Sequence, residues 1–317
     1  MIAPMTALVA DIGGTNTRVA LAGGPRLVAG SVRRYPNAEF ADLSEVLARY
    51  LAEAGSPRID GACAALAGPV RAGRGRLTNL DWTIDEAGIA RATGAKSVKL
   101  LNDLQAQGHA LDHLAPDALV PVLDGPRAAG ETRLVIGLGT GVNVTVVHRT
   151  PTGTLVTANE AGHVTLPVAD EDGLALARFA AGDDGFAAVE DILAGRGVEA
   201  LFAWVTMRAG TPRRMDGHAI IAAAPDDPAA EEALRCYTAM LGRVAGDLAL
   251  HHLPYGGIYL IGGVARAVTP HLGRLGLDRA FRAKGRFSGL MEAFAIATIT
   301  DDFAALTGCA AYLAESA

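Results

Sequence analysis

Residues 8–21 read LVADIGGTNTRVAL, and the fold of the first part of the chain follows from the DIGGTN at residues 11–16. An apolar run precedes Asp11, and a second run of β-branched and apolar residues follows Asn16. Two such runs joined by a short glycine-rich turn predict a β-hairpin. A Walker loop or a dinucleotide-binding turn would instead lead from a strand into a helix. The stretch is therefore either a tight structural turn or a loop that holds phosphate beside a metal ion.

The same pattern recurs at residues 134–147, LVIGLGTGVNVTVV, where Gly139-Thr140-Gly141 forms the turn between two predicted strands. Glycine lets backbone N–H groups approach an anion closely, and threonine hydroxyls add donors. Each hairpin taken alone is better explained as an ordinary turn, because glycine and asparagine are common in turns. Two of them in one chain suggest duplicated halves that face each other across a cleft.

A third glycine-rich junction lies in GGIYLIGGVARAV, residues 256–268. A predicted strand ends at Gly262-Gly263, and a predicted helix follows. The glycines would let an adenine or a ribose lie flat on the backbone. The alternative is a close strand–helix junction without a ligand.

Polar residues stand where predicted elements meet. In SVKLLNDLQAQGHAL a buried strand leads through Asn102 and Asp103 into a helix, and Asp103 is either an N-cap or a functional carboxylate. Glu160 and His163 in NEAGHVTLP could be two metal ligands without a third, or two hydrogen-bonding groups for a polyol. Glu190 in AAVEDILAG lies near the start of a short helix, where the helix dipole alone would favour a carboxylate.

Composition limits the classes of function. The 317 residues are enough for two domains, and 50% hydrophobic residues indicate a globular protein. A formal net charge of -6 disfavours a nucleic-acid surface. No apolar run reaches the roughly 18 residues of a membrane span, and the N-terminus lacks the basic region of a signal peptide. Cys63, Cys236 and Cys309 lie far apart, which disfavours disulfides and structural zinc and fits a cytoplasmic protein.

Taken together, these stretches resemble the bacterial glucokinases of the non-zinc type, within the hexokinase and actin-like ATPase superfamily. The resemblance covers essentially the full length, in the family's order. It is carried by LVADIGGTNTRVAL, LLNDLQAQGHAL, GLGTGVNV, EAGHV, VEDILAG, GGIYLIGGVA and FRAKGRFSGLMEAF. The cysteine-rich zinc motif of the related sugar kinases is missing, which excludes them as close relatives.

The resemblance implies a two-domain α/β protein with the actin-like (ribonuclease H-like) ATPase fold and an interdomain cleft. The small domain would span residues 1–112 and be completed by a C-terminal helix at 303–317, and the large domain would span 113–302. The implied activity is that of a glycolytic, cytoplasmic, homodimeric glucokinase. It would use ATP and Mg²⁺ to phosphorylate the 6-hydroxyl of glucose, and would bind no nucleic acid and no membrane.

The resemblance also implies roles for individual residues. The ATP-binding residues would be Asp11, Gly13, Gly14, Thr15 and Asn16 in the first phosphate loop, Gly139, Thr140 and Gly141 in the second, and Gly262 and Gly263 beside the adenosine. Asp11 would lie near the magnesium ion through water. The glucose contacts would be Asn102, Asp103, Glu160, His163 and Glu190, with Asp103 as the catalytic base.

The chain departs from the family pattern at two positions, and three alternatives remain. Asn143 and Ala161 stand where the family usually has glycine. A kinase for a different hexose is one alternative. A sugar-sensing regulator that does not catalyse would have no need of Asp103. An actin-like ATPase of the filament or chaperone type explains the glycine-rich hairpins but not the set of polar residues.

Overall fold

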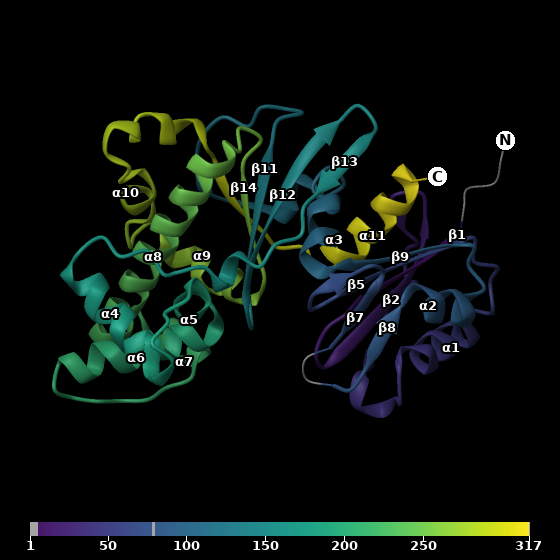
Figure 1. Cartoon of the computed structure of the whole chain (residues 1–317), viewed down its shortest axis with the longest axis horizontal. Coiled ribbons are helices and arrows are strands. Elements are labelled where there is room, and N and C mark those ends of the chain that lie inside the picture. Colours follow the sequence, from purple (N-terminus) through teal and green to yellow (C-terminus); the bar gives the residue numbers. More distant parts are fainter. Residues whose placement is uncertain (1–5, 78–79, 317) are drawn as a thin grey trace. The chain divides into compact units, whose positions relative to one another are not determined.

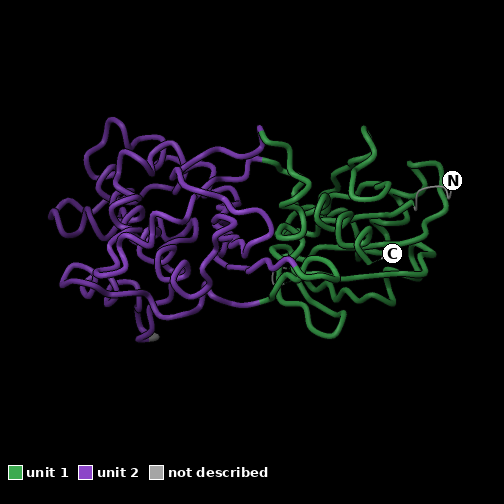
Figure 2. The backbone as a smooth tube through the Cα atoms, turned by 90° about the horizontal axis from the view of Figure 1, so that it is seen from above, with its two compact units in different colours: residues 1–116, 150–158, 301–317 green, residues 117–149, 159–300 purple. Residues whose placement is uncertain are grey.

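The structure is a computed structural model that describes residues 6–77 and 80–316. The chain divides into two compact units, which have different colours in Figure 2. Unit 1 consists of residues 1–116, 150–158 and 301–317, and unit 2 of residues 117–149 and 159–300. Residues 150–158 belong to unit 1, although they fall inside the range 113–302 that the resemblance assigns to the large domain.

Unit 1 is built on a mixed sheet with the strand order β3-β2-β1-β5-β9, in which β4 also pairs with β2. The strands are β1 (Thr6–Ile12), β2 (Asn16–Gly23), β3 (Arg26–Leu27), β4 (Arg33–Pro36), β5 (Gly61–Leu66) and β9 (Ser97–Asn102). β1, β5 and β9 are parallel, whereas β1 and β2 form an antiparallel hairpin. The hairpin predicted around DIGGTN is therefore confirmed.

Helices cover both faces of this sheet. Alternate residues of β1 point to opposite faces, and both faces carry apolar side chains that the helices bury. Ile12 packs in one core with α1 (Leu43–Glu53) and α2 (Glu86–Thr93). Val9 packs in a second core with α3 (Asp103–Ala110) and α11 (Ala304–Glu315), which lie side by side (Figure 1). A Cβ atom at Gly308 would overlap the carbonyl group of Ala106, so the close approach of α3 and α11 requires glycine there.

Unit 2 repeats this arrangement on a sheet with the order β10-β15-β14-β11-β12. The strands are β10 (Leu119–Leu123), β11 (Arg133–Leu138), β12 (Val142–Thr150), β14 (Ile258–Ile261) and β15 (Ile296–Ile299). β11, β14 and β15 are parallel, and β11 and β12 form an antiparallel hairpin. The second glycine-rich hairpin is thus confirmed as well, and in both units a hairpin leads into parallel strands.

The helices of unit 2 enclose its core. They are α4 (Glu171–Ala181), α5 (Val189–Leu193), α6 (Gly195–Arg208), α7 (Gly217–Ala223), α8 (Pro228–His252), α9 (Gly263–Leu272) and α10 (Leu277–Arg282). The Asp227 side chain caps α8 by accepting from the N–H groups of Ala229 and Ala230, and Pro228 is the first helical residue, as this residue pair predicts. Tyr237 and Leu241 of α8 are fully buried.

The remaining elements are short. They are β6 (Val70–Arg71), β7 (Arg74–Arg76), β8 (Thr83–Asp85), β13 (Gly153–Val156) and the 3₁₀ helices η1 (Asn37–Glu39), η2 (Pro116–Ala118), η3 (Ala161–His163), η4 (Gly182–Asp184), η5 (Gly285–Phe287) and η6 (Leu290–Ala293). Within residues 6–77 and 80–316, no helix has both the length and the apolar character needed to cross a membrane.

Candidate active site

The turn of the β1–β2 hairpin is fixed by a buried asparagine. The N–H of Gly13 donates to the carbonyl oxygen of Asn16 at 3.0 Å. Asn37, which is 1% exposed, donates from Nδ2 to the carbonyl oxygen of Gly13 at 2.8 Å and accepts from Thr17 Oγ1 at 2.8 Å. The turn is therefore held in one conformation, as a preorganised phosphate loop requires. No sequence motif distinguishes Asn37, so its role in the turn could not be predicted from the sequence.

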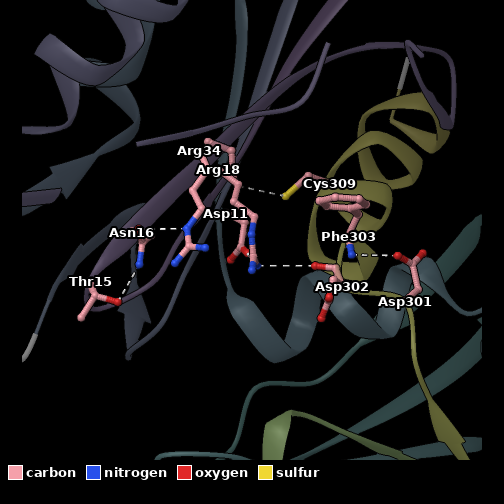
Figure 3. Close-up of polar contacts among 10 residues, drawn as sticks. Asp11, Thr15, Asn16, Arg18, Arg34, Asp301, Asp302, Phe303 and Cys309 are labelled. Atoms are coloured by element: carbon pink, nitrogen blue, oxygen red, sulfur yellow. Dashed lines mark hydrogen bonds and ion pairs between the residues drawn. The ribbon is translucent and has the colours of Figure 1, made fainter. Parts of the chain in front are cut away.

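Polar groups of the same turn lie at its surface. Asn16 donates from Nδ2 to Thr15 Oγ1 at 2.8 Å, and Arg34 donates from Nε to Asn16 Oδ1 at 3.0 Å (Figure 3). Thr15 and Arg34 are exposed. A threonine hydroxyl and a guanidinium group beside a glycine-rich turn provide hydrogen-bond donors and positive charge for an anion.

Asp11 lies at the end of β1 and pairs across the hairpin with Arg18. The two residues are direct partners in the β1–β2 register, and Arg18 Nη1 contacts Asp11 Oδ2 at 3.2 Å (Figure 3). Burial raises the pKa of Asp11, and the charge and hydrogen bond of Arg18 oppose that rise. The hairpin register could have identified Arg18 from sequence, since residues at equal distances from a turn pair with each other.

Asp11 also provides the chemistry that a hydrated magnesium ion needs. Magnesium binds oxygen ligands and usually keeps several waters, so a single carboxylate can hold it through water. Only Arg18 donates a hydrogen bond to the Asp11 side chain among the residues described, and it does so at Oδ2. The other carboxylate oxygen is thus left to accept from a metal-bound water, and the residue fits the ion.

Asp103 begins α3 at the same edge of the sheet as Asp11. The register aligns Asp11 with Ala65 of β5 and Ala65 with Leu101 of β9, so both carboxylates lie at the carboxyl ends of parallel strands. Ligands of open α/β sheets bind at this edge. The common edge is also why the two charges influence each other.

The helix cap is Asn102, and the sequence-based alternative of Asp103 as N-cap is wrong. Asn102 Oδ1 accepts from the N–H of Leu104 at 3.1 Å, and Gln105 Oε1 accepts from the N–H of Asn102 at 3.3 Å. Asn102 Nδ2 donates to the carbonyl oxygen of Gly68 at 3.0 Å. Both residues are good caps by type, and only the structure shows which of them precedes the first helical turn.

The environment of Asp103 favours a proton acceptor. Burial raises its pKa to about 6, a hydrogen bond from the N–H of Leu104 at 2.8 Å lowers it, and the negative charge of Asp11 raises it further. A general base works best when its pKa lies near the working pH. The N-terminus of α3 fixes its position, and burial adjusts its basicity.

In unit 2 the turn at residues 139–141 is held by backbone hydrogen bonds, while Thr140 and Gly141 are exposed. The N–H of Gly139 donates to the carbonyl oxygen of Gly141 at 3.0 Å. The N–H of Gly195 donates to the carbonyl oxygen of Gly139 at 2.9 Å. Gly262, with φ of +111°, lies so close that a Cβ atom would overlap the carbonyl oxygen of Leu138. The structure therefore brings the second glycine-rich turn and the β14–α9 junction together.

Glu190 joins this cluster through the first residue of β12. Its Oε2 accepts from the N–H of Val142 at 2.8 Å, and its Oε1 accepts from Arg196 Nη2 at 2.8 Å. A Cβ atom at Gly141 would lie 2.7 Å from Oε2. The side chain of Glu190 is only 13% exposed and directly contacts the turn, a proximity that sequence spacing did not reveal.

Glu160 precedes the short helix η3 and His163 is its last residue, and η3 packs against the same strand. Both residues are exposed, and the N–H of His163 donates to the carbonyl oxygen of Glu160 at 3.1 Å. A Cβ atom at Gly162 would overlap the carbonyl oxygen of Val142. Among the residues that the structure describes, no group of three or more His, Cys, Asp or Glu side chains could hold a metal ion. The pair is therefore better suited to hydrogen bonds than to metal binding.

Each unit thus collects one part of the predicted site. Unit 1 brings Asp11, Asn102 and Asp103 to one sheet edge beside the turn at residues 13–16. Unit 2 brings together the glycines and threonine of residues 139–141, Gly262 and Gly263, Glu160, His163 and Glu190 around the start of β12 and α9.

Comparison with known proteins gives a consistent result. The family model described as glucokinase matches residues 8–316. A glucokinase of Marinobacter nauticus is 32% identical over 100% of this chain and 99% of its own length. A glucokinase of Cupriavidus metallidurans is also 32% identical, over 97% of this chain and 93% of its own length.

Solved structures share the fold. A glucokinase from an Antarctic psychrotroph superposes with a TM-score of 0.88 at 27% identity, covering 97% of this chain and 98% of its own. A Balamuthia mandrillaris glucokinase, solved in complex with glucose, superposes with a TM-score of 0.79 at 22% identity, covering 98% of this chain and 94% of its own. The α/β, actin-like fold class expected from the sequence is therefore confirmed.

Proposed function

The chain belongs to the glucokinase family, and on that premise we propose that it transfers the γ-phosphate of ATP to the 6-hydroxyl of glucose. The observation that carries the proposal from family to mechanism is the carboxylate of Asp103. It is fixed at the first residue of α3, and burial raises its pKa to about 6. A sugar-binding protein that does not catalyse has no use for a base adjusted in this way.

Asp103 acts as the general base. It accepts the proton of the sugar hydroxyl as that oxygen attacks the phosphorus atom. Asn102 supports this role because its capping bonds fix the first turn of α3. Phosphoryl transfer depends on positioning and on charge stabilisation more than on covalent chemistry, so a rigidly placed base is the expected contribution of this unit.

The other sugar hydroxyls are held by Asn102, Glu160, His163 and Glu190. Glu160, which precedes η3, and His163, the last residue of η3, are exposed and thus accessible to a ligand. Glu190 already accepts from Val142 and Arg196, and a carboxylate has further lone pairs for a sugar hydroxyl. Because the Asn102 and Glu190 side chains are already held by hydrogen bonds, they lose little entropy when a sugar binds.

The phosphates are held by the two glycine-rich turns, and the adenosine by Gly262 and Gly263. The N–H groups of Gly13 and Gly139 close the two turns, and those of the other turn residues stabilise the charge that develops on the transferring group. Asp11 would hold a magnesium ion through water, and a bound ion would neutralise phosphate charge. Arg18 orients the Asp11 carboxylate, and its charge and hydrogen bond oppose the rise in the pKa of Asp11 that burial causes.

The proposal is tested by measuring ADP release with a panel of hexoses and amino sugars, each with ATP or another phosphate donor, in the presence of magnesium. Glucose is expected to give the highest rate, and 6-deoxyglucose, which lacks the acceptor hydroxyl, none above background. A stronger response to another hexose would favour the second candidate, a kinase of different specificity. This candidate is motivated by Asn143 and Ala161, which stand where the family usually has glycine. An absence of any sugar-dependent ADP release would exclude both.

Family membership also leads us to propose a homodimer in the cytoplasm. Sedimentation of the purified protein tests the first part: a mass near twice the 32.6 kDa of one chain supports it.

A further inference from the structure

Asn143, the second residue of β12, joins that strand to the segment that carries Glu160 and His163. Its Nδ2 donates to the carbonyl oxygen of Asn159 at 2.7 Å. Its Oδ1 accepts from the N–H of Ala161 at 3.2 Å and from the N–H of Val144 at 2.8 Å. One amide side chain thus contacts the backbone on both sides of Glu160.

The contact is tight because η3 lies directly on the strand. A Cβ atom at Gly162 would overlap the carbonyl oxygen of Val142, the neighbour of Asn143. The N–H of Ala161 has a second acceptor, Asn159 Oδ1, at 3.1 Å. Asn143 Nδ2, in contrast, is the only donor found for the carbonyl oxygen of Asn159 among the residues described. The Nδ2 bond is therefore the irreplaceable part of this arrangement.

We propose that Asn143 is a positioning residue for the sugar: its amide holds the Asn159–Ala161 backbone so that Glu160 and His163 point at the sugar hydroxyls. The proposal rests on the sugar kinase function proposed above. Ala161 also helps to fix this backbone, because alanine has fewer backbone conformations to lose on folding than glycine. Asn143 and Ala161, the two departures from the family pattern, are hydrogen-bonded to each other.

The glycine-rich turn at residues 139–141 does not depend on the Asn143 side chain. It is closed by its own bond from the N–H of Gly139 to the carbonyl oxygen of Gly141, and the pairing of Leu138 with Val142 continues the hairpin. Loss of the amide should therefore affect binding of the sugar and leave binding of ATP nearly unchanged. That separation distinguishes a positioning role from a general structural one.

The test compares Asn143→Asp, Asn143→Gly and the control His148→Gly. Aspartate is isosteric and keeps an acceptor for Ala161, but it loses the donor and brings a carboxylate against the carbonyl oxygen of Asn159. His148 lies on the same strand, about 17 Å along it at roughly 3.4 Å per residue, so glycine there weakens β12 without touching residues 159–161. KM for glucose, KM for ATP, kcat and the melting temperature are measured for each protein.

Both Asn143 variants are expected to raise KM for glucose about five- to tenfold, the effect of losing a hydrogen bond that fixes a ligand-binding segment. Their kcat and KM for ATP should stay within about twofold of wild type. His148→Gly should lower the melting temperature with an unchanged KM for glucose.

Asn143→Asp and Asn143→Gly proteins with wild-type KM for glucose would overturn the inference while leaving the kinase function intact. A wild-type protein that phosphorylates no hexose would instead overturn the proposed function, and the inference with it.

Discussion

Replacing Asp103 by asparagine separates the catalytic role of this carboxylate from its structural surroundings. The cap of α3 is Asn102, so the substitution leaves the cap in place. The new amide oxygen can still accept from the N–H of Leu104, which contacts Asp103 Oδ1 at 2.8 Å. The fold is therefore expected to survive, and a loss of activity can be attributed to the missing base.

The effect on stability has a defined sign. The pKa of Asp103 is raised from 3.8 to about 6, so the folded protein binds this proton more tightly than the unfolded chain does. Stability consequently falls as the pH rises from about 4 to about 6, and the full cost, up to about 3 kcal/mol, is present above that range. Asp103→Asn should be as stable as wild type near pH 4 and more stable at pH 7.5, as thermal or urea unfolding at both pH values would show.

Asp103→Asn should lower catalytic activity, although it stabilises the fold at pH 7.5. Removal of a general base costs roughly 10²- to 10⁴-fold in kcat. Wild-type kcat/KM for glucose should fall below about pH 6 as Asp103 becomes protonated, and the variant should lack this acidic limb. A folded Asp103→Asn protein with kcat within a few-fold of wild type would refute the assignment of Asp103 as the base.

Four further substitutions test other parts of the site. Asp11→Ala should fold but lose about 10²-fold or more in kcat, with little recovery at high magnesium; wild-type kinetics would make DIGGTN a purely structural turn. Asn37→Ala leaves Thr17 Oγ1 and the carbonyl oxygen of Gly13 without their buried partner. The free energy of unfolding should therefore fall by about 1–3 kcal/mol, and KM for ATP should rise. An unchanged midpoint of urea unfolding would contradict this. Gly262→Ala should destabilise the protein by at least about 1–3 kcal/mol, because φ is +111° and the Cβ would overlap the carbonyl oxygen of Leu138. In the control Gly263→Ala the new Cβ meets no atom within 4 Å, so this protein should melt at or above the wild-type temperature. Equal melting temperatures of the two variants would argue against the close packing at Gly262.

The sequence predicts those features that depend on neighbouring residues. Both hairpins follow from glycines between apolar runs, and α8 follows from Asp227, Pro228 and the spacing of Tyr237 and Leu241. The strand-to-helix junctions at Asn102 and Gly262 are found in the same way. These signals are local, and local signals survive folding when the surrounding packing agrees with them.

Features that depend on distant contacts are missed. Asn37 supports a turn 24 residues earlier in the chain. The contact of Glu190 with Val142 joins residues that are 48 positions apart. The cap of α3 is assigned wrongly because Asn102 and Asp103 have nearly equal capping propensity, so a one-residue shift leaves no trace in the sequence pattern.

In the proposed reaction the 6-hydroxyl of glucose receives the γ-phosphate of ATP. Nuclear magnetic resonance of ³¹P coupled to ¹H, applied to the product of glucose, ATP and magnesium, tests it directly because the coupling identifies the carbon that bears the phosphate. The expected product is glucose 6-phosphate, formed in equal amount to ADP. Its phosphorus couples to the two protons on carbon 6. A phosphate on another carbon, or ADP accompanied only by inorganic phosphate, would contradict it.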